Sequence, residues 1–238
     1  MAETIDTMRA VVLTGHGGPE KLEYHDDWPR PVAGPGEALV RVGACGLNNT
    51  DVNTRTAWYS KGVTGGTTGA SGGVGSALIQ LANRRGARPV AMASADKVDA
   101  VRAVGPEAVL ERSPDDLKAA IREAIGRDTV SVVADVVGGP MFPQVIGALQ
   151  RGGRYTCSGA IAGPIVDLDL RTFYLKDLTF TGATVVPPGL FADLVGYINR
   201  GEIRPLLAAT YPLAKLHDAQ QAFIAKRHVG NIVVTMDA

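Results

Sequence analysis

The stretch "GASGGVGSALIQLANRRGA", residues 69–87, decides the fold of this chain. A glycine-rich turn leads into apolar residues at helical spacing, and Gly86 has the position of a glycine that ends a helix. Such a turn can bind phosphate groups, because the free amides at the start of the helix face the anion. The residues in front of it, "GVTGGTT" (62–68), make a poor strand, although a turn of this kind needs a buried apolar strand before it.

From Gly69 onward, predicted strands alternate with predicted helices. The predicted strands are "RPVAMAS" (88–94), "AVLER" (108–112), "VSVVADVVGG" (130–139), "RYTCSGA" (154–160) and "LTFTGATVV" (178–186). The predicted helices between and after them are 96–105, 115–126, 141–153 and 190–203. This alternation predicts an α/β fold, a doubly wound parallel sheet of the Rossmann type with both faces covered.

The two ends of the chain have a different pattern. "MRAVVLTGHG" (8–17) and "EALVRVGACG" (37–46) predict antiparallel strands, and the tail after residue 206 adds a helix and a final strand. We therefore expect three segments: 1–68 and 207–238 in a β-rich part, and 69–206 in the α/β domain.

Composition excludes several function classes. The formal net charge of the 238 residues is zero, which excludes the electrostatic footprint of a general nucleic-acid binder. No apolar run approaches the roughly 20 residues that span a bilayer, and the N-terminal residues do not resemble a secretory signal. Cys45 and Cys157 form neither a disulfide framework nor a metal-spaced pair. We expect a cytoplasmic protein with a small-molecule substrate and no nucleic-acid or membrane partner.

The turn itself fits the dinucleotide-binding pattern with alanine in place of the first glycine. Gly72 would let the backbone approach a pyrophosphate, and Gly75 would let the helix pack closely on the sheet. A plain turn between strand and helix is the other interpretation, but the βαβ order favours cofactor binding. The residues concerned are Ala70, Ser71, Gly72, Gly73, Val74 and Gly75.

The end of the second strand favours NADPH over NADH. An NAD site usually has an acid there for the ribose 2′-hydroxyl, whereas this chain has none until Asp96. Ser94 and Lys97 offer a hydroxyl and a cation to a 2′-phosphate. A helix cap and a solvated lysine are the other interpretation.

Further candidate cofactor residues follow the next two strands, where open α/β sheets bind ligands. Val137 and Gly138 follow one strand, and Gly159 and Ala160 end the next. Asp135 is interpreted equally as a site residue or as a turn-capping residue.

The chain resembles the zinc-independent medium-chain dehydrogenases/reductases of the quinone oxidoreductase type. The resemblance is carried by residues 8–51, "GASGGVGSALIQLA", "SADK", residues 132–160, "LTFTGATVV" and "HDAQQAFIAKRHVGNIVV", in family order. It implies a GroES-like substrate domain built from both chain ends, with the cofactor domain inserted and the nicotinamide in the cleft. It also implies a homodimer that pairs the edge strands of the cofactor sheets.

The resemblance also bears on metal and catalysis. The position of a zinc-ligating cysteine in alcohol-oxidising relatives is Asn48 here, a poor zinc ligand, so we expect no metal. Hydride transfer from NADPH to a quinone, enone or other activated double bond is then favoured over alcohol oxidation. Candidate catalytic residues are Asn48, Tyr59 and Asp51; a turn-forming asparagine and a surface tyrosine are the other interpretations of the first two.

About a hundred family residues, a domain's worth, have no counterpart between Thr68 and Gly69. They would include the strand in front of the glycine turn, without which neighbouring strand edges stay unpaired. Either the complete polypeptide has residues that this sequence lacks, or the deletion is genuine. A genuine deletion would favour a second hypothesis, a non-catalytic NADPH-binding protein acting as a sensor or structural protein.

Overall fold

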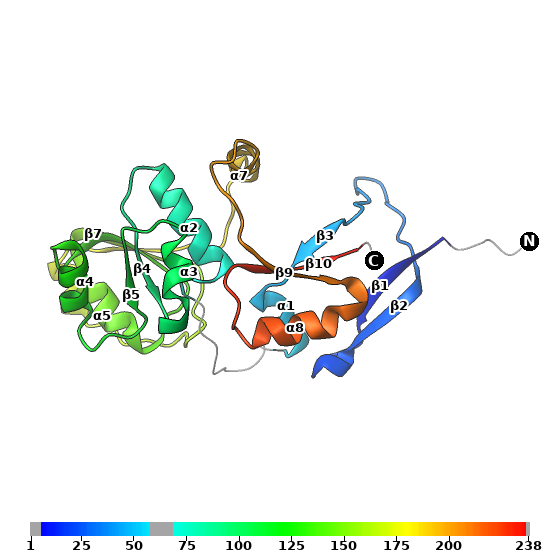
Figure 1. The fold of residues 1–238 in the computed structure, drawn as a ribbon, viewed down its shortest axis with the longest axis horizontal. Helices are drawn as coiled ribbons and strands as arrows, with labels where there is room; N and C mark the ends of the chain where they lie inside the picture. Colours follow the sequence, from blue (N-terminus) through cyan, green and yellow to red (C-terminus); the bar gives the residue numbers. More distant parts are fainter. Residues whose placement is uncertain (1–5, 58–68, 237–238) are drawn as a thin grey trace, which may run out of the picture. The chain divides into compact units, whose positions relative to one another are not determined.

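The computed structural model describes residues 6–57 and 69–236, and the chain divides into two compact units (Figure 1). The first, here the terminal unit, is formed by Met1–Val63 with Leu207–Ala238. The second, the central unit, is Thr64–Leu206. Within the described residues, none of the helices has the length and apolar character needed to cross a membrane.

The terminal unit contains two small sheets. Strands β1 (Thr7–Leu13) and β2 (Leu22–Pro29) pair antiparallel. In the other sheet, β10 (Asn231–Thr235) lies between β3 (Ala44–Gly46) and β9 (Leu207–Pro212), antiparallel to β3 and parallel to β9. The helices are α1 (Asn49–Arg55) and α8 (Leu216–Ile224), with one-turn helices at Pro19–Lys21 and Leu213–Lys215. The two ends of the chain therefore build one β-rich unit.

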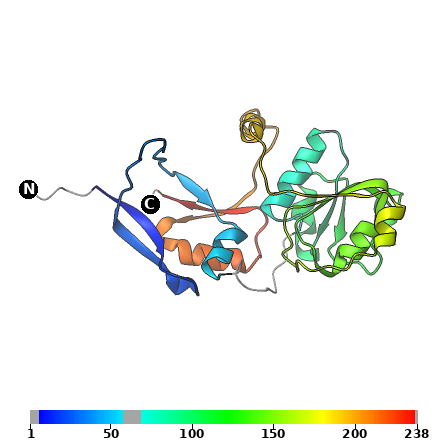
Figure 2. The same cartoon turned by 180° about the vertical axis from the view of Figure 1, so that it is seen from behind.

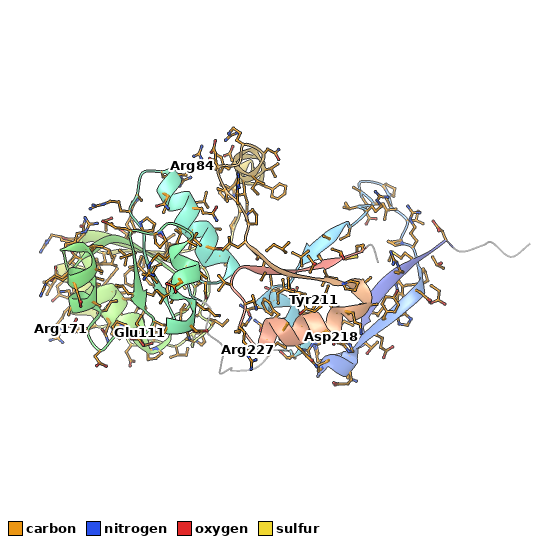
Figure 3. The ribbon with its side chains drawn as sticks, in the orientation of Figure 1. Arg84, Glu111, Arg171, Tyr211, Asp218 and Arg227 are labelled. Atoms are coloured by element: carbon orange, nitrogen blue, oxygen red, sulfur yellow. The ribbon has the colours of Figure 1, made fainter. Side chains whose placement is uncertain are left out.

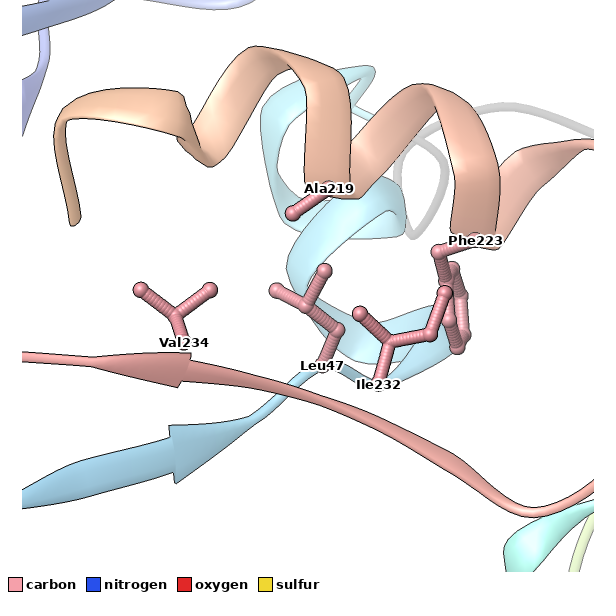
Figure 4. Close-up of a cluster of buried hydrophobic side chains, with 5 residues drawn as sticks. All are labelled: Leu47, Ala219, Phe223, Ile232 and Val234. Atoms are coloured by element: carbon pink, nitrogen blue, oxygen red, sulfur yellow. The ribbon is translucent and has the colours of Figure 1, made fainter. Parts of the chain in front are cut away.

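The core of the terminal unit lies between α8 and the sheet of β10. Ala219 and Phe223 point from α8 toward Ile232 and Val234 of β10, and Leu47 completes the cluster (Figure 4). Ala219 and Val234 are fully buried. Apolar residues alternate along β10 and recur at helical spacing on α8, so each element presents one apolar face.

The structure corrects the predicted strand at 37–46, of which only Ala44–Gly46 forms a strand. Leu39, Val40 and Val42 are exposed, at 47%, 73% and 49%. Apolar alternation yields a strand only where a neighbour offers an edge and a core, and no described strand does so here. Sequence analysis also missed β2 and β9.

The central unit alternates strands with helices, as predicted (Figure 2). Its strands are β4 (Val90–Ala93), β5 (Ala108–Glu111), β6 (Val130–Asp135), β7 (Leu149–Cys157) and β8 (Thr179–Gly182). Its α-helices are α2 (Gly73–Arg84), α3 (Val98–Arg102), α4 (Leu117–Ile125), α5 (Phe142–Gly147), α6 (Leu170–Leu175) and α7 (Leu190–Asn199). The chain therefore has an α/β fold of the Rossmann type.

The strands of the central unit are all parallel but form two separate sheets. One sheet pairs β4 with β5, and the other has the order β6–β7–β8. Among residues 69–206, no strand pairs with β4 on the side away from β5, or with β6 on the side away from β7. The residues directly in front of the glycine turn, where a strand is expected, lie outside the described part of the chain.

Three apolar clusters hold the central unit together. On one face of β4 and β5, Ile79 of α2 and Val101 of α3 pack on Ala91 and Ala93. On the other face, α4 and α5 cover a cluster that takes in Val90 and Met92 of β4 and also Val130 of β6. The third cluster lies between α5, α6 and the sheet of β6–β8, around fully buried Leu149. The two sheets therefore share one core although they share no hydrogen bonds.

Helix α7 contributes nothing to these clusters. None of its residues is buried, and Phe191 is 74% exposed. Near its C-terminal end, the guanidinium of Arg84 on α2 stacks 3.8 Å from the ring centre of Tyr197, and Arg84 pairs with Glu202 just after the helix (Arg84 is labelled in Figure 3).

Candidate functional site

The candidate cofactor residues of the central unit gather at the carboxyl ends of the parallel strands. Gly69 connects the two sheets there: the backbone amide of Ala70 donates to the Met92 carbonyl of β4 at 3.3 Å. A Cβ on Gly69 would lie 3.1 Å from that carbonyl and 4.0 Å from the side chain of Val137, which follows β6. The turn thus begins at the carboxyl ends of both sheets, where open α/β sheets bind ligands.

Gly75 has the packing role that the sequence predicts. A Cβ at this position would lie 2.6 Å from the Ala70 Cα and 2.6 Å from the Gly69 carbonyl oxygen. Both are backbone atoms of the turn itself, so a side chain at position 75 would force the turn away from the helix. The absence of a side chain here allows the turn to fold tightly onto α2.

The start of the helix that follows has the free amides that could hold a phosphate group. Gly72 caps α2 with extended backbone, and the first intrahelical acceptor is its carbonyl, bonded by the Ser76 amide at 3.0 Å. The amides of Gly73, Val74 and Gly75 therefore have no partner within the helix and lie at its positive end. Ser71 is buried and Val74 is 56% exposed. This arrangement fits a pyrophosphate.

Ser94 and Lys97 both follow β4 directly, and the Lys97 amide donates to the Ser94 carbonyl at 2.9 Å. Sequence analysis predicts that these two residues contact one ligand. The Ser94 hydroxyl donates to the carboxylate of Asp96, which lowers the Asp96 pKa. Lys97 is buried, at 5% exposed; burial lowers its pKa, the Asp96 carboxylate partly opposes this, and the nearby charge of Arg112 adds a smaller lowering. A bound anion would offset the repulsion between the two cations.

Arg112 lies near Lys97, and the sequence analysis did not include it among the candidate residues for the 2′-phosphate. It follows β5 directly, and β5 pairs with β4 in parallel, so the two strand ends lie side by side. The signal was present in "AVLER", because the carboxyl ends of neighbouring parallel strands meet at one edge of the sheet.

Asp135 fastens the turn after β6. Its carboxylate accepts from the Val137 amide at 2.7 Å, from the Gly138 amide at 3.1 Å and from the Tyr155 hydroxyl at 2.8 Å. Burial, then the hydrogen bond to Asp135, raises the Tyr155 pKa strongly, so the phenol stays protonated. Asp135 therefore acts as a turn-capping residue, because its carboxylate accepts from both backbone amides. Val137 and Gly138 can contact a ligand only through their other atoms.

The loops after β6 and β7 pack tightly on each other. The Ala162 amide donates to the Val137 carbonyl at 2.8 Å, and a Cβ on Gly138 would lie 2.8 Å from the Gly163 carbonyl. A Cβ on Gly159 would lie 3.2 Å from the Val136 carbonyl. Gly138 and Gly159, together with the small Ala160, allow the two loops to pack against each other at the strand ends.

The candidate catalytic residues belong to the terminal unit. Asn48 caps α1: its backbone amide donates to the Asp51 carboxylate at 2.6 Å, and its side-chain amide donates to the Gly46 carbonyl at 3.3 Å. Both residues are exposed and already have local structural roles. Tyr59 lies outside the described residues.

The donor groups of the described residues do not fit a metal ion. No three His, Cys, Asp or Glu side chains gather as ligands within residues 6–57 and 69–236. Cys45 lies on β3 opposite Val234, and burial, with a smaller effect of Asp51, raises the pKa of its thiol, which disfavours the thiolate that zinc binds. We therefore derive no step through zinc.

Comparison with known proteins places this geometry in a family. Residues 73–200, more than half of the chain, match the family described as zinc-binding dehydrogenase. Acryloyl-coenzyme A reductase of Metallosphaera sedula is 28% identical over 170 residues, covering 71% of this chain and 49% of the relative. The chain thus spans about half the length of the curated relatives that it matches.

Two solved structures extend the comparison. A putative alcohol dehydrogenase from Sinorhizobium meliloti 1021 is 34% identical, with a TM-score of 0.87 over 99% of this chain and 98% of that one. A 2-octenoyl-CoA carboxylase reductase, in complex with NADP and 2-octenoyl-CoA, is 28% identical, with a TM-score of 0.64 over 70% of this chain and 41% of that one. The glycine turn, the parallel strands and these matches agree: the chain belongs to the zinc-binding dehydrogenase family, among the medium-chain dehydrogenases/reductases.

Proposed function

We propose that this protein is an NADPH-dependent oxidoreductase that transfers hydride to an activated double bond, without zinc. The observation that carries the proposal is the turn of residues 69–75, folded so tightly onto α2 that position 75 has no room for a Cβ. Three helix amides at the carboxyl ends of both sheets would then face the pyrophosphate of the cofactor. NADPH would supply the hydride.

The 2′-phosphate of NADPH is assigned to the residues after β4 and β5. Burial first, and the nearby charge of Arg112 to a smaller extent, lower the pKa of Lys97, and a phosphate here would favour the charged form of the lysine. Ser94 is the third member of this group, although its hydroxyl already bonds Asp96. No carboxylate that prefers a free 2′-hydroxyl ends β4, whose last residue is Ala93.

The substrate class is an activated carbon–carbon double bond: a quinone, an enone or a 2-enoyl thioester. The names of the relatives support thioesters, since one is an acryloyl-coenzyme A reductase and a solved neighbour holds 2-octenoyl-CoA. Charge from hydride addition to such a bond spreads to a distant oxygen, so hydrogen bonds and exclusion of water can assist the step. Asn48, Asp51 and Tyr59 remain the proposed contacts, with soluble homodimers paired through β8 as the proposed assembly.

A second candidate function, NADPH binding without catalysis, is favoured by one observation. The two sheets of the central unit leave the facing edges of β4 and β6 without a strand among the described residues. A protein in this state could keep the phosphate-binding turn and lack a formed substrate pocket. The chain also matches only 49% of the acryloyl-coenzyme A reductase of Metallosphaera sedula, which fits the same proposal.

The test is a titration of the full chain with NADPH and NADH, followed by oxidation assays with a quinone, an enone and a 2-enoyl-CoA. We expect Lys97→Ala to weaken NADPH at least tenfold and NADH about twofold or less, because only NADPH has the 2′-phosphate. Lys118→Ala, at an exposed lysine of α4, is the matched control. Equal losses for both cofactors would contradict the 2′-phosphate assignment, and binding without turnover would favour the second candidate.

A further inference from the structure

Tyr155 of β7 has a ring that is fixed by packing and a hydroxyl that reaches the carboxyl end of the neighbouring strand. The side chain is 6% exposed. Its ring centre lies 5.4 Å from that of Phe142, edge to face, and 5.2 Å from that of Phe180. A buried phenol needs a hydrogen-bond partner, and the Tyr155 hydroxyl donates at 2.8 Å to a carboxylate oxygen of Asp135, the last residue of β6. The packed ring therefore helps to set where the Asp135 carboxylate lies.

The Asp135 carboxylate connects Tyr155 to the turn that follows β6. Its other oxygen accepts from the Val137 amide at 2.7 Å and from the Gly138 amide at 3.1 Å. The backbone of Asp135 is held as well, because its carbonyl accepts from the Ser158 amide at 3.0 Å. The carboxylate is thus oriented by residues of β7 and just after it, and it holds two amides of the turn.

The turn after β6 borders the glycine turn. A Cβ on Gly69 would lie 4.0 Å from the Val137 side chain. The Val137 carbonyl accepts from the Ala162 amide at 2.8 Å, and a Cβ on Gly138 would lie 2.8 Å from the Gly163 carbonyl oxygen. The position of Val137 beside the glycine turn therefore depends on Asp135 and on the loop after β7.

The place of this turn relative to the cofactor follows from the proposed function, on which this inference rests. The 2′-phosphate of NADPH is assigned to residues after β4 and the pyrophosphate to the start of α2. The glycine turn lies at the ends of both sheets, so a dinucleotide held there would extend its nicotinamide half over the ends of β6 and β7. Val137 would then form part of the surface against which that half lies.

We propose that Tyr155 is a positioning residue for the cofactor: through Asp135, its hydroxyl holds Val137 where the nicotinamide half of NADPH binds. Tyr155 itself does not touch the cofactor and transfers no proton. Burial, then the hydrogen bond to Asp135, raises the pKa of its phenol strongly, so the hydroxyl stays a donor. Removing the hydroxyl therefore changes cofactor affinity through the turn and not through a lost contact.

The first measurement needs no cofactor and uses the full chain. Tyr155→Phe keeps the ring and removes the hydroxyl, and Tyr174→Phe, at a residue of α6 that is 60% exposed, is the matched control. We expect hydrogen exchange of the Val137 and Gly138 amides to be about fivefold faster in Tyr155→Phe, because the carboxylate loses a bond that orients it. Exchange in β4 should stay unchanged, as should all these rates in Tyr174→Phe. Unchanged exchange at the turn, or equal acceleration in β4, would overturn the proposal.

The second measurement titrates the same variants with NADPH and with adenosine 2′,5′-bisphosphate, which lacks the nicotinamide half. We expect Tyr155→Phe to weaken NADPH about fivefold and the bisphosphate less than twofold. Equal losses would mean that the hydroxyl supports the fold as a whole, and they would overturn the proposal, as would an unchanged affinity for NADPH. Absence of NADPH binding by the unsubstituted chain would contradict the proposed function itself, and the cofactor role of Tyr155 with it.

A double-mutant cycle tests whether Tyr155 acts through Asp135. Asp135→Asn keeps the shape of the side chain but replaces one acceptor oxygen by a donor. Adding Tyr155→Phe to Asp135→Asn should weaken NADPH less than twofold further, because the connection through the carboxylate is already broken. A further loss of about fivefold would show that the hydroxyl acts by another route, which overturns the proposal. If Asp135→Asn fails to fold, the two measurements on Tyr155→Phe decide.

Discussion

Strands β4 and β6 face the same unpaired region of the central unit, but they are covered differently. In β4, Ala91 and Ala93 are buried under α2 and α3, and the opposite face lies on the cluster with α4. In β6, Val133 faces the cluster beneath α5, whereas Val132 and Ala134 on the opposite face are exposed. A parallel strand needs cover on both faces, and only β4 has it.

The difference follows from where the helices dock. Helix α2 carries Ile79 onto β4, because Gly75 allows the turn to fold tightly against the helix start. Helix α7, which has apolar residues at 190, 191, 195 and 198, buries none of them, and its Tyr197 contacts Arg84 of α2 near the C-terminal end of the helix. Within the described part of the central unit, β4 is thus covered on both faces, whereas β6 is covered on one.

The largest expected effect on stability comes from disrupting the packing of α2 over β4. Gly75→Ala should lower the free energy of unfolding by about 2 to 3 kcal/mol, because the new Cβ meets backbone atoms at 2.6 Å. Gly147→Ala, in α5 with no atom within 4 Å of its Cβ, is the matched control and should be neutral or slightly stabilising. Urea unfolding measures both; equal effects would show that the turn tolerates a side chain.

A pair of valine truncations measures the difference in cover directly. Val101→Ala, at a fully buried residue of α3, should cost about 2 kcal/mol through a cavity over β4 and β5. Val132→Ala, at the exposed position of β6, should cost less than about 1 kcal/mol. Urea denaturation with the same probe compares them, and similar costs would mean that the face of β6 at Val132 is covered in solution.

The smallest expected effect concerns the attachment of α7. The side chains of Arg200 and Arg84 hydrogen-bond the Glu202 carboxylate and lower its pKa from 4.5 to about 2. Because the folded-state pKa is the lower one, the ion pairs stabilise fully above pH 4.5, and their contribution is lost as the pH falls toward 2.

Hydrogen exchange of residues 190–204 should therefore accelerate modestly between pH 5 and pH 3 after correction for intrinsic rates. Glu202→Gln should remove this dependence, whereas Asp193→Asn, on α7 itself, should keep it. An unchanged profile in Glu202→Gln would show that the stacking of Arg84 on Tyr197 is sufficient to hold the helix.

Much of the central unit could be predicted from the sequence, because its signals are local. Helical spacing after Gly75, the acid at the start of 96–105 and the apolar runs at 88–94 and 130–139 each specify an element without reference to distant residues. The structure shifts some boundaries: the helix predicted at 141–153 ends at Gly147, and β7 begins at Leu149. Because glycine is rare in strands, Gly152 and Gly153 hid from the prediction that β7 begins before them.

The candidate site was predicted only in part. The turn of residues 69–75 and the pairing of Ser94 with Lys97 could be read from spacing, whereas Arg112 joins them only because β5 pairs with β4. Likewise, the bond from Tyr155 to Asp135 joins residues on neighbouring strands, and it decides that Asp135 fastens its own turn.

By itself, the sequence determined the order of the elements, the phosphate-binding turn and the lack of a strand-like segment in front of it, since each depends on neighbouring residues. Only the tertiary structure decided which strands pair, which faces are covered and which edges stay free. Pairing and burial depend on distant segments: residues 37–42 have the pattern of a strand but pair with no described strand, and β6 pairs with a described strand on one side. The sequence pattern of a strand shows which face it can bury, and packing against neighbouring segments determines whether that face is buried.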